Sequence, residues 1–523
     1  MNRRLIGAVI LLLLGTIGIV GLWYFMPRYR DVQIKATSDA QRTKGKITIA
    51  LDNWIGYFVL RSPELEQQMR RAGWQLVIQD DDADYAQRMR RLRDGEIDFA
   101  AATIDSYILN AAGLGFPGTI IMVIDESKGG DAILARSDRV SGLDALKGTT
   151  DTKVAFTPQS PSHHLLKAAA YHFNVPELVP QDPTHRIETR GSKEALNKLL
   201  SGAADLAVMW EPDVSRGLAH PGVVKVLGTE DTEKLIVDVF LVNRKYSMKN
   251  PEVVTLLLSH YFRALKKYQE APDLFRSQVV AETGLPEKTV DSMLKGVRWI
   301  NLTQNCEQWF GISHPGGTSH DGLRQAIEST VRILTNAGDF AGDPLPDGDP
   351  YRLTYSVFLA DLFVKGVTGF TAPKPSAETV KPTGSLEARF PSLSEADWEK
   401  LKEVGSLKVD PIVFQQGGAE LDLLAKEVVD RAVALFSHYP NFRLVIKGHT
   451  GTKGDPEENR LLSQERADAV ARYLVVTHNI DPNRLRATGF GGSKPLPEQP
   501  GETQRSWQYR LPRVELVLVR EEY

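Results

Sequence analysis

Cysteine is nearly absent from this chain of 523 residues, because Cys306 is its only example. A single cysteine excludes an intramolecular disulfide and a zinc site built from several cysteines. We interpret Cys306 as a small buried side chain and not as a reactive thiol. The count leaves the compartment open, since a chain without disulfides fits the cytoplasm and the periplasm equally well.

An excess of charge of one sign is also lacking. The formal net charge is -3, and lysine and arginine are spread along the chain instead of forming a block. This distribution predicts no nucleic-acid partner. Hydrophobic residues make up 42% and charged residues 25%, as in ordinary globular proteins. Because 523 residues are too many for one hydrophobic core, we expect two or more domains.

Motifs typical of enzymes are missing from the sequence. It has no phosphate-binding loop of the Gly-x4-Gly-Lys-Ser/Thr type, no zinc-protease helix and no nucleophile elbow. The run Ser319-His320-Asp321 holds the residue types of a catalytic triad, but neighbours in sequence cannot adopt the geometry of one. We therefore predict no enzyme activity, no cofactor and no metal site.

The chain begins with a long apolar run. No charge occurs from Leu5 to Met26, and as a helix this run would extend roughly 33 Å, enough to cross a bilayer core. Trp23 and Tyr24 stand where an interfacial aromatic belt would lie, and the run does not end in the small-x-small site of a cleaved signal peptide. We predict a retained transmembrane helix in residues 1–30, with the N-terminus inside.

Residues 46–366 alternate short apolar runs with helical patterns, and this alternation predicts largely parallel α/β sheets with crossover helices. Strands are expected at 47–51, 74–78, 99–102, 119–124, 154–156 and 206–210. Helices are expected at 84–93, 162–173, 192–200 and through most of 251–337.

A linker rich in Pro, Ser, Thr and Gly follows at 367–393. The remaining 394–523 predict a compact α/β domain. Its strands are expected at 412–414, 444–447 and 514–519, and its helices at 420–437 and 459–476.

The C-terminal domain carries a spaced motif. The letters Ile-Lys-Gly-His-Thr-Gly at 446–451 are followed by Asn, Ser and Arg on the next helical pattern, and by Gly-Phe-Gly at 489–491. This pattern resembles the OmpA-like peptidoglycan-binding family. The binding residues that the resemblance implies are His449, Thr450, Asn459, Ser463, Arg466 and Arg513.

The spacing of three of these residues has a physical meaning. Asn459, Ser463 and Arg466 stand at i, i+4 and i+7, so a helix would place them on one face. A guanidinium at the edge of a core suits bidentate capture of a carboxylate, such as that of diaminopimelate in cell-wall peptides. The resemblance implies this role for Arg466, whereas the alternative is a solvated arginine that pairs with a neighbouring carboxylate.

The motif departs from the family at two places. Gly451 stands where the family usually has an Asp that meets the ammonium of the ligand, and Leu511-Pro512-Arg513 replaces an Asn-Arg-Arg. Loss of a carboxylate partner typically costs a few kcal/mol, roughly a hundredfold in affinity. Asp455 lies on the same loop and could compensate.

Several short sequence motifs in residues 46–366 occur in a recognisable order. They are Ala50-Leu51-Asp52-Asn53-Trp54, Asp94-Gly95-Glu96-Ile97-Asp98, Ser127-Lys128-Gly129-Gly130-Asp131, Ser160-Pro161-Ser162-His163 and Trp210-Glu211-Pro212. Their order resembles the nitrate/taurine-type periplasmic solute-binding proteins of ABC importers. The resemblance implies two α/β lobes of the periplasmic-binding-protein type II kind, hinged around a ligand cleft, with crossovers between the lobes near 130–136 and 236–242.

The expected cleft chemistry follows from helix starts and flat side chains. Ser160 is a predicted N-cap before Pro161, so backbone amides of the first helical turn would face the cleft. Amides and His163 favour an oxyanion or sulfonate-like ligand, whereas Asp52, Asp105, Asp131 and Glu211 would suit an amine. The candidate solute-binding residues are Trp54, Asp105, Ser106, Asp131, Ser160, Ser162, His163, Trp210, Glu211 and Asp238.

The two resemblances and the apolar run together predict a single-pass bacterial inner-membrane protein whose bulk is periplasmic. Its expected partners are a small polar solute or oxyanion, peptidoglycan, the membrane through one helix, and an ABC permease or another envelope protein. The alternative is a mechanical protein that links membrane and wall through a solute-binding fold without a ligand. A collapsed cleft would favour this alternative.

Overall fold

The computed structural model describes residues 43–313, 319–365, 390–415 and 417–521. The predicted membrane helix in 1–30 and most of the predicted linker at 367–393 lie outside these residues. Within the described ranges, no helix is both long enough and apolar enough to cross a membrane.

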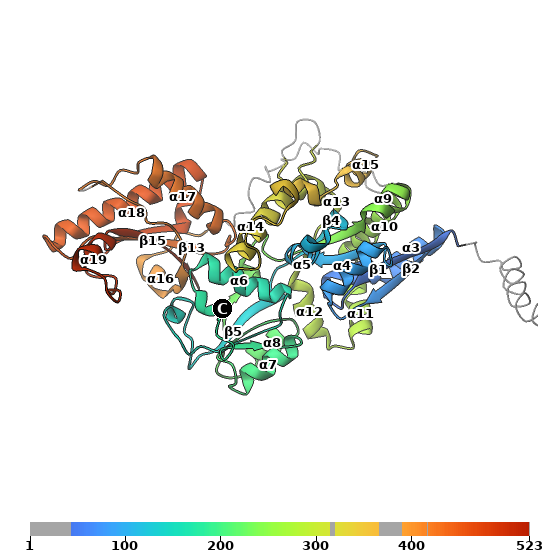
Figure 1. Ribbon diagram of the computed structural model, residues 1–523, viewed down its shortest axis with the longest axis horizontal. Coiled ribbons are helices and arrows are strands. Elements are labelled where there is room, and N and C mark those ends of the chain that lie inside the picture. Colours follow the sequence, from blue (N-terminus) through green and yellow to red (C-terminus); the bar gives the residue numbers. More distant parts are fainter. Residues whose placement is uncertain (1–42, 314–318, 366–389, 416, 522–523) are drawn as a thin grey trace, which may run out of the picture.

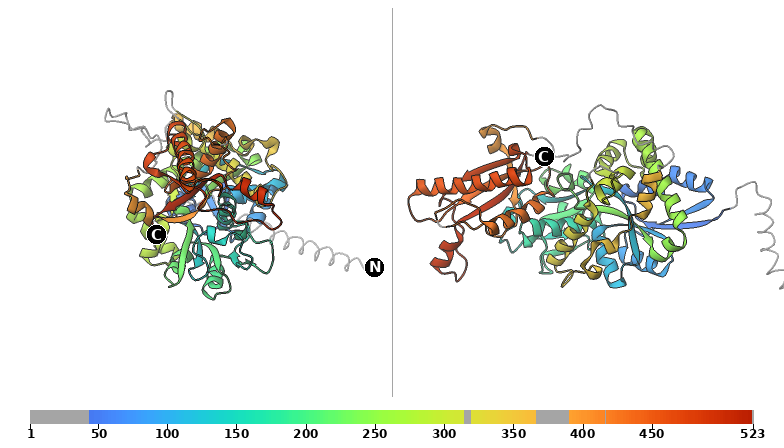
Figure 2. Two further views of the ribbon diagram at one scale, coloured as in Figure 1. Left: turned by 90° about the vertical axis from the view of Figure 1, so that its left-hand side faces the viewer. Right: turned by 90° about the horizontal axis from the view of Figure 1, so that it is seen from above.

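Three bodies follow one another along the long axis of the molecule (Figure 1), and the view from above in Figure 2 shows the same order. Lobe 1 lies at one end, lobe 2 is central, and a C-terminal module lies at the other end. Each body has its own β-sheet.

Lobe 1 is built on a six-stranded sheet of order β11-β4-β10-β3-β1-β2. Its strands are β1 (Gly45–Leu51), β2 (Trp74–Asp80), β3 (Phe99–Thr103), β4 (Gly118–Ser127), β10 (Val237–Asn243) and β11 (Val297–Trp299). Its early helices are α2 (Phe58–Arg61), α3 (Pro63–Arg71), α4 (Tyr85–Asp94) and α5 (Ile104–Ala111). The later ones are α9 (Arg244–Lys249), α10 (Pro251–Glu270), α11 (Pro272–Thr283), α12 (Glu287–Lys295), α13 (Leu302–Gln304), the π-helix η6 (Asn305–Trp309), α14 (Gly322–Asn336) and α15 (Val357–Lys365).

Helices cover both faces of the lobe 1 sheet. Phe99 and Ala101 of β3 face one hydrophobic core, and the alternate residues Ala100 and Ala102 face a second. Cys306 is buried in the first of these cores, as expected.

Lobe 2 has a five-stranded sheet of order β7-β6-β8-β5-β9. Its strands are β5 (Asp131–Arg136), β6 (Val154–Phe156), β7 (Arg186–Glu188), β8 (Leu206–Trp210) and β9 (Val223–Gly228). Its helices are α6 (Pro161–His172), α7 (Ser192–Leu200) and α8 (Asp213–Leu218).

The chain passes between the lobes twice, at 128–130 from β4 to β5 and at 229–236 from β9 to β10. This route explains why the expectation of largely parallel sheets was only partly right. In lobe 1, β1 runs parallel to β2 and β3, but β10 is antiparallel to β3 and β4. In lobe 2, β5 is antiparallel to β8 and β9. Strand β4 leaves lobe 1 at the end where β10 enters it, so these two strands run in opposite directions. The same holds in lobe 2 for β5, which enters, and β9, which leaves.

The C-terminal module has a four-stranded sheet of order β12-β15-β13-β14. Its strands are β12 (Lys402–Ser406), β13 (Arg443–His449), β14 (Leu485–Gly489) and β15 (Arg513–Arg520), and its helices are α16 (Glu395–Lys400), α17 (Leu423–Phe436), α18 (Pro456–His478) and α19 (Gln504–Arg510). Helix α18 packs on β13 and β14. A Cβ at Gly448 would lie 2.0 Å from the carbonyl oxygen of Ser463, so this glycine allows β13 to approach α18 closely.

The strand predicted at 412–414 is wrong. The edge strand of the module is β12, ten residues earlier, which pairs with β15. Beyond Leu407 the chain leaves the sheet, because the Lys408 amide donates to the carbonyl of His172 in lobe 2 at 2.6 Å. A contact with another body therefore overrides the apolar pattern of the strand.

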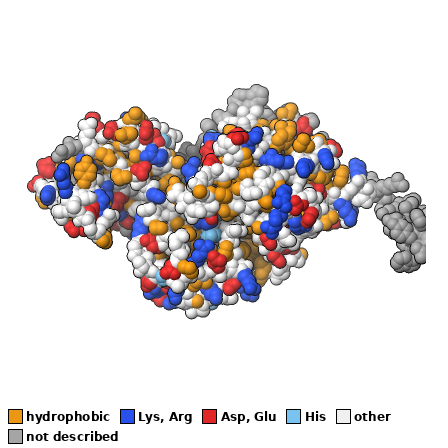
Figure 3. Space-filling model, viewed as in Figure 1, with side chains coloured by type: hydrophobic (Ala, Val, Ile, Leu, Met, Phe, Trp, Pro, Cys, Tyr) orange, Lys and Arg blue, Asp and Glu red, His pale blue; other side chains and the backbone are white. Residues whose placement is uncertain are grey.

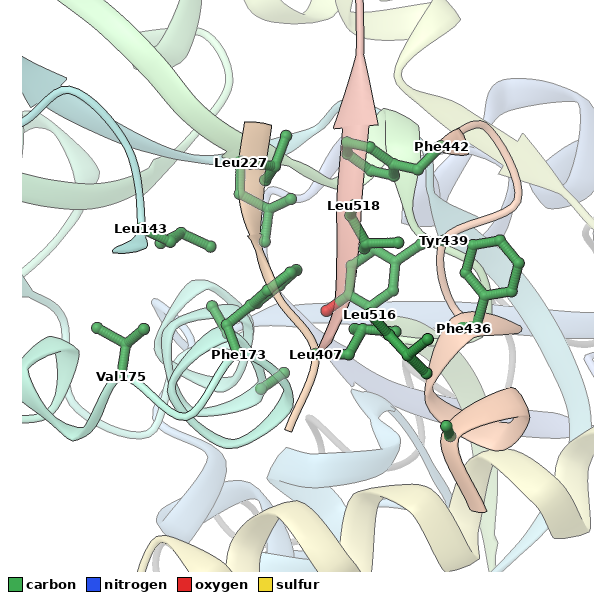
Figure 4. Close-up of a cluster of buried hydrophobic side chains, with 14 of the residues drawn as sticks. Leu143, Phe173, Val175, Leu227, Leu407, Phe436, Tyr439, Phe442, Leu516 and Leu518 are labelled. Atoms are coloured by element: carbon green, nitrogen blue, oxygen red, sulfur yellow. The ribbon is translucent and has the colours of Figure 1, made fainter. Parts of the chain in front are cut away.

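The module packs directly on lobe 2 through a single apolar cluster (Figure 4). The labelled side chains from lobe 2 are Leu143, Phe173, Val175 and Leu227, and those from the module are Leu407, Phe436, Tyr439, Phe442, Leu516 and Leu518. Because one hydrophobic core crosses the boundary, lobe 2 and the module form one packed unit.

Candidate functional site

Four buried carboxyl groups gather where the crossovers join the lobes. Asp105, Asp125, Asp131 and Asp238 are 2%, 0%, 3% and 1% exposed. Asp125 of β4 and Asp238 of β10 are partners in strand register, and Asp131 opens β5 just after the first crossover. Asp105 lies in the first turn of α5, two residues after Thr103, which pairs with Asp238. The fold thus collects carboxyl groups from both lobes.

These carboxyl groups form no ion pair with any described residue, and burial raises their pKa values. The pKa of Asp105 and that of Asp131 rise to about 6, and that of Asp125 rises to about 7. Burial, followed by the charge of Asp125, raises the pKa of Asp238 well above its ordinary value. One oxygen each of Asp105 and Asp125 lacks a hydrogen-bond partner among the described residues. The cluster is therefore short of positive charge and of donors.

Neighbouring donors stabilise part of this negative charge. The Trp54 indole donates to Asp125 at 3.3 Å, and the Tyr57 hydroxyl donates to Asp238. The hydroxyls of Ser127 and Ser162 donate to Asp131, the first at 2.8 Å. The structure thus brings Ser162 of lobe 2 to the cluster, as predicted for a cleft.

Asp52 is different, because it has a cation. The buried guanidinium of Arg88 donates to Asp52 at 3.0 Å and also pairs with Asp81. Arg88 therefore compensates the charge of Asp52 without a ligand, although Asp52 was predicted from the sequence as a partner for an amine.

The start of α6 does not offer a free anion site. Ser160 is the N-cap, as predicted, but its hydroxyl already accepts from the His163 amide at 3.1 Å. The His163 ring stacks on Phe156, with 4.3 Å between ring centroids, and burial lowers its pKa to about 2, so the ring is neutral. These facts weigh against the expected oxyanion or sulfonate-like ligand.

The other predicted cleft residues are occupied by local bonds. The Ser106 hydroxyl accepts from Thr103 at 2.7 Å, and Glu211 accepts from the amide and hydroxyl of Ser215 at 3.0 and 2.7 Å. Trp210 is half-buried, and its main chain bonds to Ser192.

Sequence reasoning missed Asp125 and Tyr57. A signal for Asp125 was present, since it is a carboxylate directly after the fully apolar run 120–124. Within the described residues, no group of three or more His, Cys, Asp or Glu side chains is placed to hold a metal ion.

A second candidate site lies on the module, on the inner face of α18. Arg466 is 6% exposed, donates to the carbonyl of Gly418 at 2.9 Å and lies over the Phe414 ring at 5.1 Å. Ser463 is buried on the same face and accepts from the Gly491 amide at 2.8 Å. Asn459, Ser463 and Arg466 all lie on α18, so the predicted helix face is formed. The Asn459 side chain donates to the carbonyl of Lys453 at 2.9 Å.

The ends of β13 and β15 adjoin this face. Their pairing sets His449 opposite Arg513. His449 is buried and stacks on Phe490, and Arg513 donates to Glu515 at 2.7 Å. The Thr450 amide donates to the carbonyl of Gly491 at 2.9 Å.

Asp455 does not replace the missing aspartate at Gly451. Its carboxylate caps α18 and accepts from the amides of Glu457 and Glu458 at 2.9 and 3.0 Å. The loop nevertheless has room, because the nearest atom to a Cβ at Gly451 would be the Gln508 oxygen, at 3.6 Å.

The comparison with known families concerns this second site. Residues 413–508 match the OmpA family. We call the C-terminal module that contains this match the OmpA-family module. This chain is 38% identical over 74 residues to the peptidoglycan-associated lipoprotein of Pseudomonas aeruginosa, covering 14% of this chain and 42% of that protein. The similarity to the protein of the same name from Rhizobium meliloti is 32% over 87 residues, covering 17% and 49%. A longer match, 34% over 154 residues, is to the photosystem I P700 chlorophyll a apoprotein A2 of Gloeobacter violaceus, covering 28% and 16%. The chain spans less than half the length of these curated relatives.

Solved structures similar to this chain include the periplasmic aliphatic sulphonate binding protein of Escherichia coli. It has 21% identity and a TM-score of 0.41, and the match covers 48% of this chain and 84% of that one. The periplasmic nitrate-binding protein of Synechocystis has 13% identity and a TM-score of 0.42, covering 64% and 90%.

Proposed function

We propose that this protein is a periplasmic solute receptor, anchored in the inner membrane by its apolar N-terminal run, that docks on peptidoglycan through its OmpA-family module. The names of the relatives of the module support wall binding, and the arginine held at the edge of its core supports capture of a carboxylate. An ABC permease or another envelope protein would sense the closure of the two lobes.

The solute carries an amine. The observation that carries this proposal is the set of four buried carboxyl groups that form no ion pair with any described residue. A buried carboxylate is costly unless a positive charge or several donors meet it, and this cluster draws on both lobes. An ammonium that enters as the lobes open would supply the missing charge when they close.

A thermal-shift panel on the full-length protein in detergent tests the ligand class. We expect 1,4-diaminobutane to raise the melting temperature at pH 7.5, and ethanesulfonate, nitrate and magnesium to leave it unchanged. Asp131→Asn should weaken diamine binding roughly a hundredfold, because it removes one charged partner. Asp138→Asn is the matched control, since Asp138 is exposed and paired with Arg136 on the same lobe. Stabilisation by an anion and by none of the amines would contradict the proposal.

Co-sedimentation of the full-length protein with isolated sacculi tests wall binding. Arg466→Ala should lose binding, whereas Arg472→Ala, an exposed arginine on the same helix, should retain it. Gly451→Asp should bind more tightly by roughly tenfold or more, since it restores a partner for the ligand ammonium. Equal pelleting of wild type and Arg466→Ala would remove Arg466 from the site.

Carbonate extraction of membranes tests the anchor. We expect the full-length chain to stay in the membrane pellet and a chain without residues 1–42 to be released. Release of both would place the protein in the periplasm without an anchor.

The mechanical alternative keeps one observation in its favour. Trp54 packs against the first crossover so closely that a Cβ at Gly130 would lie 2.4 Å from its ring, and the carboxyl cluster is buried. A junction that never opens would show the same close packing and the same buried carboxyl groups. The thermal-shift panel separates the two, because a mechanical protein would respond to no solute.

A further inference from the structure

The OmpA-family module touches the second crossover between the lobes, and not lobe 2 alone. The Asn441 side chain donates to the carbonyl of Glu230 at 3.1 Å. His438 makes two bonds to Glu233. The His438 carbonyl accepts from the Glu233 amide at 2.8 Å, and the His438 Nδ1 lies 2.8 Å from the Glu233 carbonyl. Arg520 pairs with Asp231. We call His438, Asn441 and Arg520 the hinge-contact surface.

The same crossover is tied to the carboxyl cluster. The hydroxyl of Thr229, its first residue, accepts from the amides of Gly129 and Asp131 at 3.0 and 3.1 Å. It also lies 2.9 Å from the hydroxyl of Ser127, which donates to Asp131. Thr229 therefore joins the two crossovers at the solute site, and the next residue, Glu230, is held by the module.

Further contacts connect the crossover to lobe 1. The Lys234 amide donates to Glu126 of β4 at 2.6 Å. The Nε2 of His438 lies 2.9 Å from the hydroxyl of Ser329 on α14, which packs against α5 of lobe 1 and α6 of lobe 2 (Figure 1). His438 thus meets both the crossover and the helix that lies between the lobes.

The body of the module is held elsewhere, by lobe 2. Besides the apolar cluster, Ser406 donates its amide to Asp144 of lobe 2 at 3.1 Å. Rotation of one lobe against the other changes main-chain angles in the crossovers. Because the module is fixed to lobe 2 and also bonded to the second crossover, that rotation must change or break the bonds of the hinge-contact surface.

We propose that the hinge-contact surface couples the two binding events of this protein, so that wall binding by the module shifts the equilibrium between open and closed lobes. The proposal rests on the proposed function for its two ligands. Coupling of this kind is reciprocal, so solute binding changes the affinity for the wall by the same factor. The partner of this surface is thus the crossover of the same chain, and its effect is on the solute site.

Pulsed electron paramagnetic resonance on the full-length protein tests the coupling. Spin labels on cysteines introduced at the exposed positions Glu96 of lobe 1 and Lys193 of lobe 2 report the distance between the lobes, and the buried Cys306 is not labelled. Asn441 is exposed, so Asn441→Ala should fold. We expect it to shift or broaden the distance distribution. The control Ser406→Ala removes the bond of the Ser406 hydroxyl to Asp144 of lobe 2, at 3.3 Å, without touching the crossover, and should leave the distribution unchanged. An unchanged distribution in Asn441→Ala, or the same change in both variants, would overturn the proposal.

A second arm adds a diaminopimelate-containing muropeptide. We expect a shift of the distribution in the wild type and a smaller shift in Asn441→Ala. A muropeptide that binds, as measured by calorimetry, but leaves the wild-type distribution unchanged overturns the coupling. A muropeptide that does not bind overturns the proposed wall function instead, and the comparison of Asn441→Ala with Ser406→Ala then decides whether the surface controls the hinge.

Discussion

The junction between the lobes and the interface between lobe 2 and the OmpA-family module both bury ionisable groups, but imidazoles predominate at the interface and carboxyl groups at the junction. At the interface, both ring nitrogens of His438 have hydrogen-bond partners. Nδ1 of His172 bonds to the Tyr439 hydroxyl at 2.7 Å, and its neutral Nε2 has no partner among the described residues. At the junction, Asp105 and Asp125 each keep an oxygen without a partner among the described residues. The interface thus leaves one imidazole nitrogen without a partner, whereas the junction leaves oxygens of two carboxyl groups without one.

The side chains that surround these ionisable groups also differ between the interface and the junction. Aromatic and aliphatic groups from both bodies fill the interface (Figure 4), so its separation would expose a large apolar area. The junction is lined by carboxyl and hydroxyl groups, which water can solvate when the lobes part. On the proposed function, the junction is therefore the part that moves, whereas the interface stays closed. On the outside, acidic and basic side chains are interspersed over the face shown in Figure 3.

Loss of the Tyr439 ring should have the largest effect on this contrast. The ring is fully buried and packs on Phe173 of lobe 2 and Phe442 of the module. We expect Tyr439→Ala to lower the free energy of unfolding by about 3 to 5 kcal/mol and to let the module unfold in a separate transition in urea. Tyr509→Ala is the control, because Tyr509 is 88% exposed. Equal effects of the two changes would mean that the interface adds little stability.

Acidification should act with opposite sign on the His438 imidazole at the interface and on the junction carboxyl groups. Burial lowers the pKa of His438 to about 4, so between its ordinary pKa of about 6.5 and about 4 the unfolded chain binds a proton that the folded chain does not. Acid therefore weakens the interface, by about 2 kcal/mol at pH 4.5 for this residue alone. The junction carboxyls, with raised pKa values, bind protons in the folded chain first and gain stability from acid. Urea unfolding of His438→Gln at pH 7.5 and 4.5 should show less loss of stability on acidification than the wild type. A steeper loss would reverse the sign argued here.

Neutralising one junction carboxyl should stabilise the protein at pH 7.5. Asp125→Asn keeps an oxygen for the Trp54 indole and turns an amide toward Asp238, while it removes a buried charge. We expect the free energy of unfolding to rise by about 1 to 2 kcal/mol at pH 7.5, with no gain at pH 4. A loss at pH 7.5 would show that the charge of Asp125 is already compensated in the folded chain.

The smallest effect concerns a single hydrogen bond of the interface. Tyr439→Phe keeps the ring and removes its bond to His172. We expect a loss of about 1 kcal/mol in urea unfolding, far less than for Tyr439→Ala. A loss as large as that of Tyr439→Ala would mean that the hydrogen bond, and not the ring, holds the module.

The sequence predicted those parts that depend on local pattern. The strands at 47–51 and 154–156, the helix at 192–200 and the cap at Ser160 all appear in the structure. The face of α18 with Arg466 was predictable as well, since helical spacing alone defines it.

What escaped prediction depends on contacts between distant segments. The meeting of Asp125 with Asp238 requires the register of two strands that belong to different parts of the chain. The interface requires that the aromatic residues of 436–442 meet lobe 2, although nothing in their spacing marks a surface for another body. The error at 412–414 has the same origin, because the bond between Lys408 and His172 diverts the chain.

Hydrogen–deuterium exchange of the full-length protein tests most directly whether the junction moves while the interface stays closed. The account predicts fast exchange for amides around Ser106 and His163, which slows when 1,4-diaminobutane is added, and slow exchange for those of Leu407 and Lys408 in both conditions. Exchange at the interface as fast as that at the junction, or a junction that is protected without a solute and indifferent to it, would contradict the account.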